Sequence, residues 1–252
     1  MMDQLLLTLQ SVRRSRVWLS IFRREQLPQT EADWLAMNRR NFFVHVLPAK
    51  MHRGSARLSY NWLWMGVVST WLFVILTLTG IFLMFYFVPS VERAYDSIKE
   101  IMNSVTLGRF MRNMHRWAAN VMVFAVALHM FRVFWTASYQ KPREFNWVIG
   151  VLLFVVTIMF AFSGYIVPWD QLGYYAAKIA SNIADGVPYI GPQVKQILLG
   201  GTDLNQPSLL RWYVIHVFVL PLVIVLLIGV HFWRIRKDDY SKPIDSERGR
   251  KR

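Results

Sequence analysis

The chain has 252 residues, of which 54% are hydrophobic and 17% charged, and its formal net charge is +14. Its charges are kept apart from long apolar runs, which excludes an ordinary soluble domain and assigns the positive charge to membrane topology and anionic lipid, not to nucleic-acid binding. The lack of cysteine excludes disulfides, thiolate metal sites and thioether-linked haem.

Residues 1–59 form a basic N-terminal arm. A short apolar opening is followed by arginines, the reverse of the order in a secretory signal, and this pattern predicts a basic amphipathic helix on the inner membrane surface. A disordered basic arm and a targeting peptide are the alternatives. His45 and His52 lie in this polar arm and are interpreted as ordinary surface histidines.

Four apolar stretches are predicted to cross the membrane as helices. They lie at residues 61–88, 114–136, 146–167 and 210–233. Pro89 and Pro168 end the first and third stretches, because proline cannot continue a helix. In the long loop between the third and fourth, residues 171–184 are predicted to form a short amphipathic helix, followed by a turn and a second short helix.

The predicted fold is all-α, a transmembrane four-helix bundle. Its domains are the arm, a four-helix domain at residues 60–237 and a basic tail at residues 238–252. Of the 29 Lys and Arg residues, 21 lie in the arm, in the link between the second and third spans with Arg132 at its edge, and in the segment from Arg234 onward. Positive charge collects on the cytoplasmic side, so both termini are expected there.

Four histidines lie singly within the second and fourth predicted spans. His115 and His129 are 14 residues apart, and His216 and His231 are 15 apart. At about 1.5 Å and 100° per residue, each interval separates its histidines by roughly 21 to 22 Å on one general face of a helix. A single histidine in a membrane helix is explained equally well by a hydrogen bond to a neighbouring helix.

The direction of the two helices turns these intervals into pairs. Because the second and fourth spans run the same way, His115 and His216 share an outer level, and His129 and His231 share an inner level. We call them the outer pair and the inner pair. Two levels of facing histidines are the arrangement that two stacked bis-histidine haems require. A four-helix transporter or scaffold with packing histidines is an alternative that leaves the matched levels unexplained.

Glycines in the first and third spans repeat the histidine interval. Gly66 and Gly80 are 14 residues apart, as are Gly150 and Gly164. Gly66 and Gly150 fall at the inner level and the other two at the outer level, where the lack of a side chain lets a flat macrocycle approach the backbone. Small-residue helix packing is the alternative for any one glycine.

Three arginines lie close to the histidines in sequence. Arg112 and Arg116 flank His115, and Arg132 follows His129 by three residues. Guanidinium groups pair well with carboxylates such as haem propionates. Interfacial arginines that extend toward water are the alternative.

The chain resembles the cytochrome b6 subunit of the cytochrome b6f and cytochrome bc complex family, which is the N-terminal four-helix half of a split cytochrome b. The motifs that carry the resemblance include RNMHRWAAN at 112–120, LHMFRVF at 128–134, KPREFNWVIGV at 141–151, GYIVPWDQLGYYAAKI at 164–179 and HFWRIRK at 231–237. The 15-residue histidine interval and the PWDQ sequence are typical of the b6 branch.

The resemblance implies a subunit of a quinol-oxidising complex that is not active alone. It implies a low-potential haem b at the outer pair, a high-potential haem b at the inner pair, and electron transfer inward from quinol oxidation to quinone reduction, which contributes to a proton gradient. It places Pro168, Trp169 and Asp170 in one wall of the outer quinol pocket. Arg236 occupies the position of a family arginine at the inner quinone site, beside Lys237 and Asp238.

The implied partners are a three-helix protein like subunit IV, a Rieske iron–sulfur protein and a c-type cytochrome, in a dimeric complex with lipid in a bacterial plasma membrane. The chain departs from the b6 pattern at Trp64, where the family has the cysteine that attaches an additional haem; a covalent third haem is therefore not expected. A second redox interpretation is a di-haem anchor subunit of a membrane dehydrogenase or hydrogenase.

Overall fold

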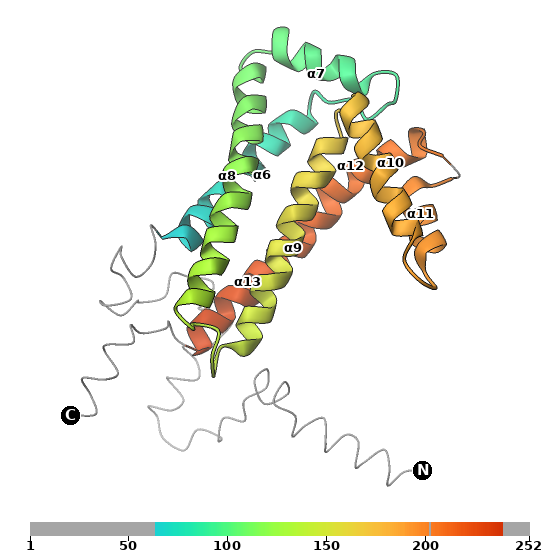
Figure 1. Ribbon diagram of the computed structural model, residues 1–252. Coiled ribbons are helices and arrows are strands. Elements are labelled where there is room, and N and C mark those ends of the chain that lie inside the picture. Colours follow the sequence, from blue (N-terminus) through green and yellow to red (C-terminus); the bar gives the residue numbers. More distant parts are fainter. Residues whose placement is uncertain (1–63, 202, 239–252) are drawn as a thin grey trace, which may run out of the picture. The chain divides into compact units, whose positions relative to one another are not determined.

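The computed structural model describes residues 64–201 and 203–238, and these residues form helices joined by turns, with no strand among them (Figure 1). The predicted arm, with its amphipathic helix, His45 and His52, and nearly all of the tail lie outside the described residues. Four helical segments are long and apolar enough to cross a membrane, which confirms the four predicted spans. They are α6 (Met65–Met84), α8 (Gly108–Trp135), α9 (Glu144–Ile166) and the continuous segment Gln206–Asp238.

The fourth span consists of three consecutive helical pieces. α12 (Gln206–Val214) leads into a short π-helix, η1 (Ile215–Val219), and α13 (Leu220–Asp238) follows. The span begins earlier than the predicted residue 210, because Asn205 and Ser208 cap its first turn: the Asn205 N–H donates to Ser208 Oγ over 3.1 Å. The first span is shorter than predicted, since residues 85–88 leave the helix before Pro89.

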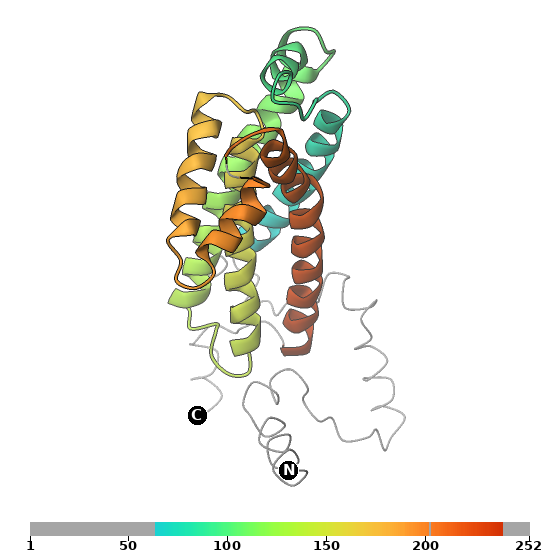
Figure 2. The same cartoon turned by 90° about the vertical axis from the view of Figure 1, so that its right-hand side faces the viewer.

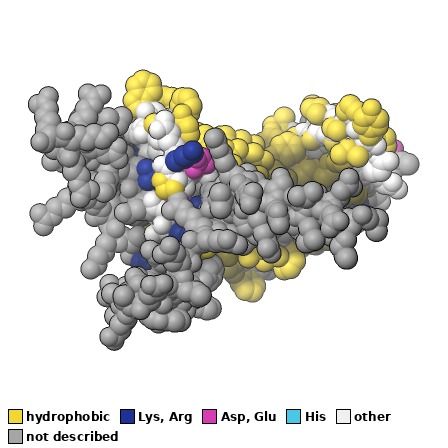
Figure 3. All heavy atoms as spheres, turned by 90° about the horizontal axis from the view of Figure 1, so that it is seen from below, with side chains coloured by type: hydrophobic (Ala, Val, Ile, Leu, Met, Phe, Trp, Pro, Cys, Tyr) yellow, Lys and Arg dark blue, Asp and Glu magenta, His cyan; other side chains and the backbone are white. Residues whose placement is uncertain are grey.

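The spans carry their large hydrophobic side chains on the outside. Trp135 is 70% exposed, Trp117 68% and Leu78 65%. Figure 3 shows hydrophobic side chains on the described residues that are visible from one side. Contiguous apolar surface of this kind is rare on a soluble protein and is the normal exterior of a helix in lipid. The chain is therefore an integral membrane protein.

The helices divide into two compact units. We name each unit after the histidine pair that it contains: the outer unit consists of Met65–Ala127 and Phe154–Val225, and the described part of the inner unit consists of Trp64, Leu128–Leu153 and residues 226–238. The outer unit holds the main hydrophobic core, made by residues of the loops and of the span ends that adjoin them. Its buried members are Phe87, Ala94, Ile101, Ile166, Trp169, Ala177, Leu209 and Trp212.

Two short helices in the long loop belong to the outer unit. α10 (Gln171–Asp185) confirms the predicted amphipathic helix, and α11 (Gly191–Leu199) confirms the second one. The two lie side by side (Figure 2). Gly200 ends α11 with a φ of 73°, a left-handed conformation that favours glycine. The Arg211 guanidinium then donates to the carbonyls of Gln196 and Ile197, which satisfies the end of α11.

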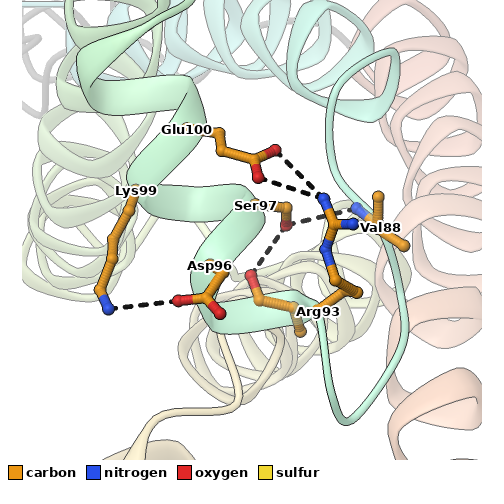
Figure 4. A network of polar contacts seen from close by, with 7 residues as sticks. Val88, Arg93, Asp96, Ser97, Lys99 and Glu100 are labelled. Carbon is orange, nitrogen blue, oxygen red and sulfur yellow. Dashed lines mark hydrogen bonds and ion pairs between the residues drawn. The ribbon is translucent and has the colours of Figure 1, made fainter.

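A further helix, α7 (Ala94–Asn103), was not predicted. Ala94, Ser97 and Ile101 are buried, at the i, i+3 and i+7 positions of one helix face. The opposite face is polar: Arg93 pairs with Glu100 over 3.1 Å and Lys99 with Asp96 over 3.2 Å (Figure 4). This spacing of small and apolar residues is the sequence signal by which α7 could have been found.

The inner unit contains a buried ion pair. The guanidinium of Arg234, which is fully buried, lies 2.7 Å from the Asp238 carboxylate one turn along α13. The same guanidinium lies over the rings of Phe145, at the start of α9, and Trp233. A buried cation needs such partners, because its desolvation is otherwise too costly.

Candidate functional site: two facing histidine pairs

The outer unit brings His115 and His216 together. His115 lies on α8 and His216 within η1, and their ring centroids are 6.4 Å apart with the ring planes at 73°. The Phe160 ring packs edge-on against the His216 ring, with centroids 5.6 Å apart. The contact joins the second and fourth spans at the level that the sequence predicts.

The inner unit brings His129 and His231 together in nearly the same geometry. Their ring centroids are 6.5 Å apart and the ring planes meet at 81°. His129 comes from the inner part of α8 and His231 from α13. Each histidine therefore faces the partner predicted from helix direction.

Both pairs have the separation of two imidazoles bound to one metal ion. Metal–imidazole bonds are about 2.0–2.1 Å long and a ring nitrogen lies roughly 1.2 Å from its centroid, so two imidazoles on opposite sides of one ion would have centroids about 6.4–6.6 Å apart. Among the described residues no group of three or more His, Cys, Asp or Glu side chains could hold an ion. Two histidines at this distance could hold the iron of one haem between them, because the porphyrin would supply the remaining ligands.

The π-helix explains the unequal intervals on the two ligand helices. In η1 the Leu220 N–H bonds to the Ile215 carbonyl, a five-residue step that places one extra residue in the turn. The 15-residue interval from His216 to His231 therefore covers about the same rotation as the 14-residue interval from His115 to His129 on α8. Pro221 is the second residue after η1. It has no N–H to donate and its ring crowds a regular helix, which favours the wider turn.

Two of the four predicted glycines contact the outer pair. A Cβ on Gly164 would lie 2.8 Å from His216 Cε1, and a Cβ on Gly80 would lie 3.3 Å from His115 Cε1. In the inner unit, a Cβ on Gly150 would meet the Met130 sulfur at 3.6 Å, an ordinary contact. Gly66 lies in the other unit from the inner pair, so its role stays a prediction.

The arginines differ in exposure. Arg112 is half-buried, with its Nη1 3.7 Å from the Met102 sulfur, whereas Arg116 is exposed. Arg132 is 9% exposed, in the inner unit that holds His129. Contacts of these side chains with propionates stay predictions.

The three residues of the predicted quinol wall have defined structural roles. Asp170 is the N-cap of α10 and accepts a 2.7 Å hydrogen bond from the Gly173 N–H. Trp169 is buried in the outer core, with a left-handed φ of 53°, and its ring packs edge-on against Tyr174. Pro168 ends the preceding helix. The segment is thus held rigidly at the start of α10.

Arg236 is partly buried in the last turn of α13, and Lys237 lies over the Trp233 ring. Asp238 forms the ion pair with Arg234. A role of Asp238 in proton uptake would therefore require the carboxylate to leave this ion pair. Arg234 itself was not singled out from the sequence. Its position three residues after His231, on the same helix face, was the available signal.

Sequence reasoning also missed two hydroxyl groups beside the outer pair. Thr79 Oγ1 lies 2.9 Å from His115 Nδ1, and Ser163 Oγ lies 2.9 Å from His216 Nδ1. Each hydroxyl residue directly precedes an outer glycine, which is the pattern by which it could have been found.

Comparisons with known proteins place the chain in a family. The sequence model of the family described as Cytochrome b/b6/petB matches residues 51–239. Cytochrome b6 of Acaryochloris marina is 42% identical over 180 residues, 71% of this chain and 84% of the relative. Cytochrome b6 of Porphyra purpurea is 43% identical over 172 residues, 68% of this chain and 80% of the relative.

A solved structure shares the fold. A chain of a structure titled "Hyperthermophilic respiratory Complex III" matches with a TM-score of 0.65 and 28% identity over 84% of this chain. The present chain spans 55% of the length of that one.

Proposed function

The chain belongs to the cytochrome b/b6 family, and we propose that it is the di-haem cytochrome b subunit of a quinol-oxidising complex of the bc or b6f type. The observation that carries the proposal is the pair of histidine contacts, each with a centroid separation at which the two rings could hold one metal ion between them. Family membership disfavours the alternative of a dehydrogenase or hydrogenase anchor.

In this proposal His115 and His216 hold one haem b and His129 and His231 hold a second. When bound, haem supplies one-electron chemistry, low-potential at the outer pair and high-potential at the inner pair, so that electrons pass inward. Gly164 and Gly80 leave room beside the outer ligands. Further candidate contacts with the two groups are Gly66, Gly150, Arg112, Arg116 and Arg132.

Quinol chemistry is assigned to the two ends of the spans. Pro168, Trp169 and Asp170 would form one wall of an outer quinol pocket, where the α10 N-cap fixes the backbone. Arg236 would bind quinone or guide protons at the inner side. The excess of Lys and Arg in the arm, the second link and the tail supports placing both termini on the cytoplasmic side, here of a bacterial plasma membrane.

The proposed partners complete what this chain does not supply. A subunit IV-like protein would close the outer pocket, and a Rieske protein would take one electron from each quinol and pass it to a c-type cytochrome. The net result would be proton release outside and uptake inside. A dimeric complex with bound lipid is expected.

Rapid mixing of the purified complex with quinol tests the proposal. We expect quinol to reduce b-type haem, and we expect His115→Ala to abolish reduction through the outer site while His231→Ala leaves the outer haem reducible. The proposal is wrong if quinol reduces b-type haem equally fast in His115→Ala and in the unaltered complex, or if only the donor of a dehydrogenase reduces it.

The predicted lack of a covalent third haem has its own test. Trp64, at the position of the family's cysteine, is 39% exposed and has no thiol to form a thioether. A haem-stained denaturing gel should show no band at the mass of this chain. A stained band there would contradict the assignment.

A further inference from the structure

Each histidine of the outer pair has a buried hydroxyl group against its Nδ1 atom. Thr79 Oγ1, on α6, lies 2.9 Å from His115 Nδ1, and Ser163 Oγ, on α9, lies 2.9 Å from His216 Nδ1. Both hydroxyl residues are 1% exposed. Two different helices thus present the same group, in the same geometry, to the two ligands of one site.

The other contacts of these hydroxyls fix the direction of the hydrogen bonds. Thr79 Oγ1 lies 2.7 Å from the Ile75 carbonyl, and Ser163 Oγ lies 3.1 Å from the Phe160 carbonyl. A carbonyl only accepts and a hydroxyl has one hydrogen, so each hydroxyl donates to its helix and accepts from the imidazole. The protonated nitrogen of each ring is therefore Nδ1, which leaves Nε2 bare to bind iron.

A hydrogen bond from Nδ1–H changes the basicity of the imidazole as well as its orientation. Donation from Nδ1–H raises the basicity of the imidazole toward a metal. A more basic ligand stabilises the oxidised, more positive iron and so lowers the reduction potential, and hydrogen bonding around the ligands is one of the protein's means of setting that potential. Two such bonds at one site act in the same direction.

The inner pair differs in this respect. His231 Nδ1 is buried and has no hydrogen-bond partner among the described residues. The residues that precede the inner glycines are Met65 and Ile149, neither of which carries a hydroxyl. The hydroxyl–glycine pairs Thr79–Gly80 and Ser163–Gly164 therefore belong to the outer level alone.

We propose that Thr79 and Ser163 are positioning residues that hold His115 and His216 in the iron-binding tautomer and lower the potential of the outer haem relative to the inner one. This inference deepens the proposed function, since it rests on haem binding at the outer pair. It assigns a structural cause to the difference in potential between the two levels.

Redox titration of the purified complex, followed by the absorbance of each haem, tests the inference. Thr79→Val keeps the branched shape and removes the hydroxyl, and Ser163→Ala does the same for the second ligand. We expect each variant to shift the outer midpoint potential upward, the double variant to shift it further, and the inner potential to stay constant. Thr79→Ser, which restores the hydroxyl, should restore the potential.

Thr77→Val is the matched control. Thr77 is on the same helix and its hydroxyl donates to the Phe73 carbonyl over 2.9 Å, but it is exposed. It should leave both potentials unchanged. If Thr79→Val loses the outer haem, retention of that haem in Thr79→Ser supports the positioning role, whereas loss in both shows that the hydroxyl is not the cause.

An unchanged outer potential in Thr79→Val and Ser163→Ala, with haem retained, would overturn the inference. Failure of the proposed function looks different: the unaltered complex would contain haem that quinol does not reduce, and the effect of the hydroxyls on the potential could still be measured.

Discussion

The outer and inner histidine pairs have the same ligand separation and different surroundings. Their ring centroids are 6.4 and 6.5 Å apart. The two outer histidines lie against two hydroxyls and two close glycines. One of these histidines, His216, is in a π-helix. In the inner unit, α13 carries the buried Arg234–Asp238 pair and Gly150 faces a flexible methionine.

This difference separates two properties of a bis-histidine site. Whether a haem binds depends on the distance between two imidazoles, which helix spacing sets at both levels. The reduction potential of a bound haem would depend on the neighbours of each imidazole, which are different at the two levels. Substitutions at one level should therefore leave the other level intact.

Loss of one ligand should remove one haem and spare the other. His115→Ala or His216→Ala should lower the haem content from two to one per chain and remove the low-potential component, because the outer pair lies wholly within the outer unit. His129→Ala or His231→Ala should remove the high-potential component. Haem extraction and redox titration measure both effects. Loss of both haems in all four variants, at equal protein levels, would contradict the two-site account.

A one-residue deletion should have opposite results on the two ligand helices. Deleting exposed Phe124 from α8 should rotate one of its histidines by about 100° and abolish at least one haem. Deleting exposed Phe218 from η1 removes the extra residue, so the π-turn can become a regular helix. The deletion is combined with Pro221→Ala, because the proline ring would clash with that regular helix. This combined variant should retain both haems.

The haem content of the two deletion variants decides between these expectations. Equal haem loss in both would show that the π-helix does not compensate for the longer interval.

Added side chains at the glycines should have graded effects. A Cβ at Gly164 would lie 2.8 Å from the His216 ring, whereas at Gly80 the distance is 3.3 Å. Gly164→Ala should therefore destabilise outer haem binding by about 1 to 3 kcal/mol, as overpacking does, and Gly80→Ala by less. Gly150→Ala is the control, because its Cβ would make an ordinary contact with Met130. Haem retention during thermal denaturation measures the order; a larger effect at Gly150 would reverse it.

The smallest predicted effect concerns Asp170. Asp170→Ala removes the N-cap of α10 and should cost about 1 kcal/mol of stability, whereas Asp170→Asn keeps a capping oxygen and should cost little. Thermal denaturation measures the stability, and quinol oxidation by the same samples measures activity. If Asp170→Asn is stable but loses activity, the carboxylate has a chemical role in addition to the cap.

The sequence was sufficient to predict the four spans and which histidines face each other. Hydrophobic runs of membrane length fix the spans, and matched intervals on helices of the same direction fix the pairs. The placement of Gly80 and Gly164 at the outer level also follows from their spacing, whereas their closeness to the histidine rings came from the structure. These features are periodic, and periodicity can be read along a chain.

The features that were missed depend on tertiary contacts. Thr79 and Ser163 look like ordinary hydroxyl residues in apolar helices until their distance from the imidazoles is known. The π-helix is visible in the sequence only as one extra residue, and Arg234 only as a charge in a basic tail. Which side chain meets which neighbour across two helices is decided by packing, so these roles needed the structure.

A reduced-minus-oxidised spectrum recorded during redox titration of the purified protein tests the central claim most directly. Two facing histidine pairs predict two b-type components of equal amount, the lower-potential one lost in His216→Ala and the higher-potential one lost in His231→Ala. A protein without b-type absorption, or with a single component that either substitution removes, would contradict the account.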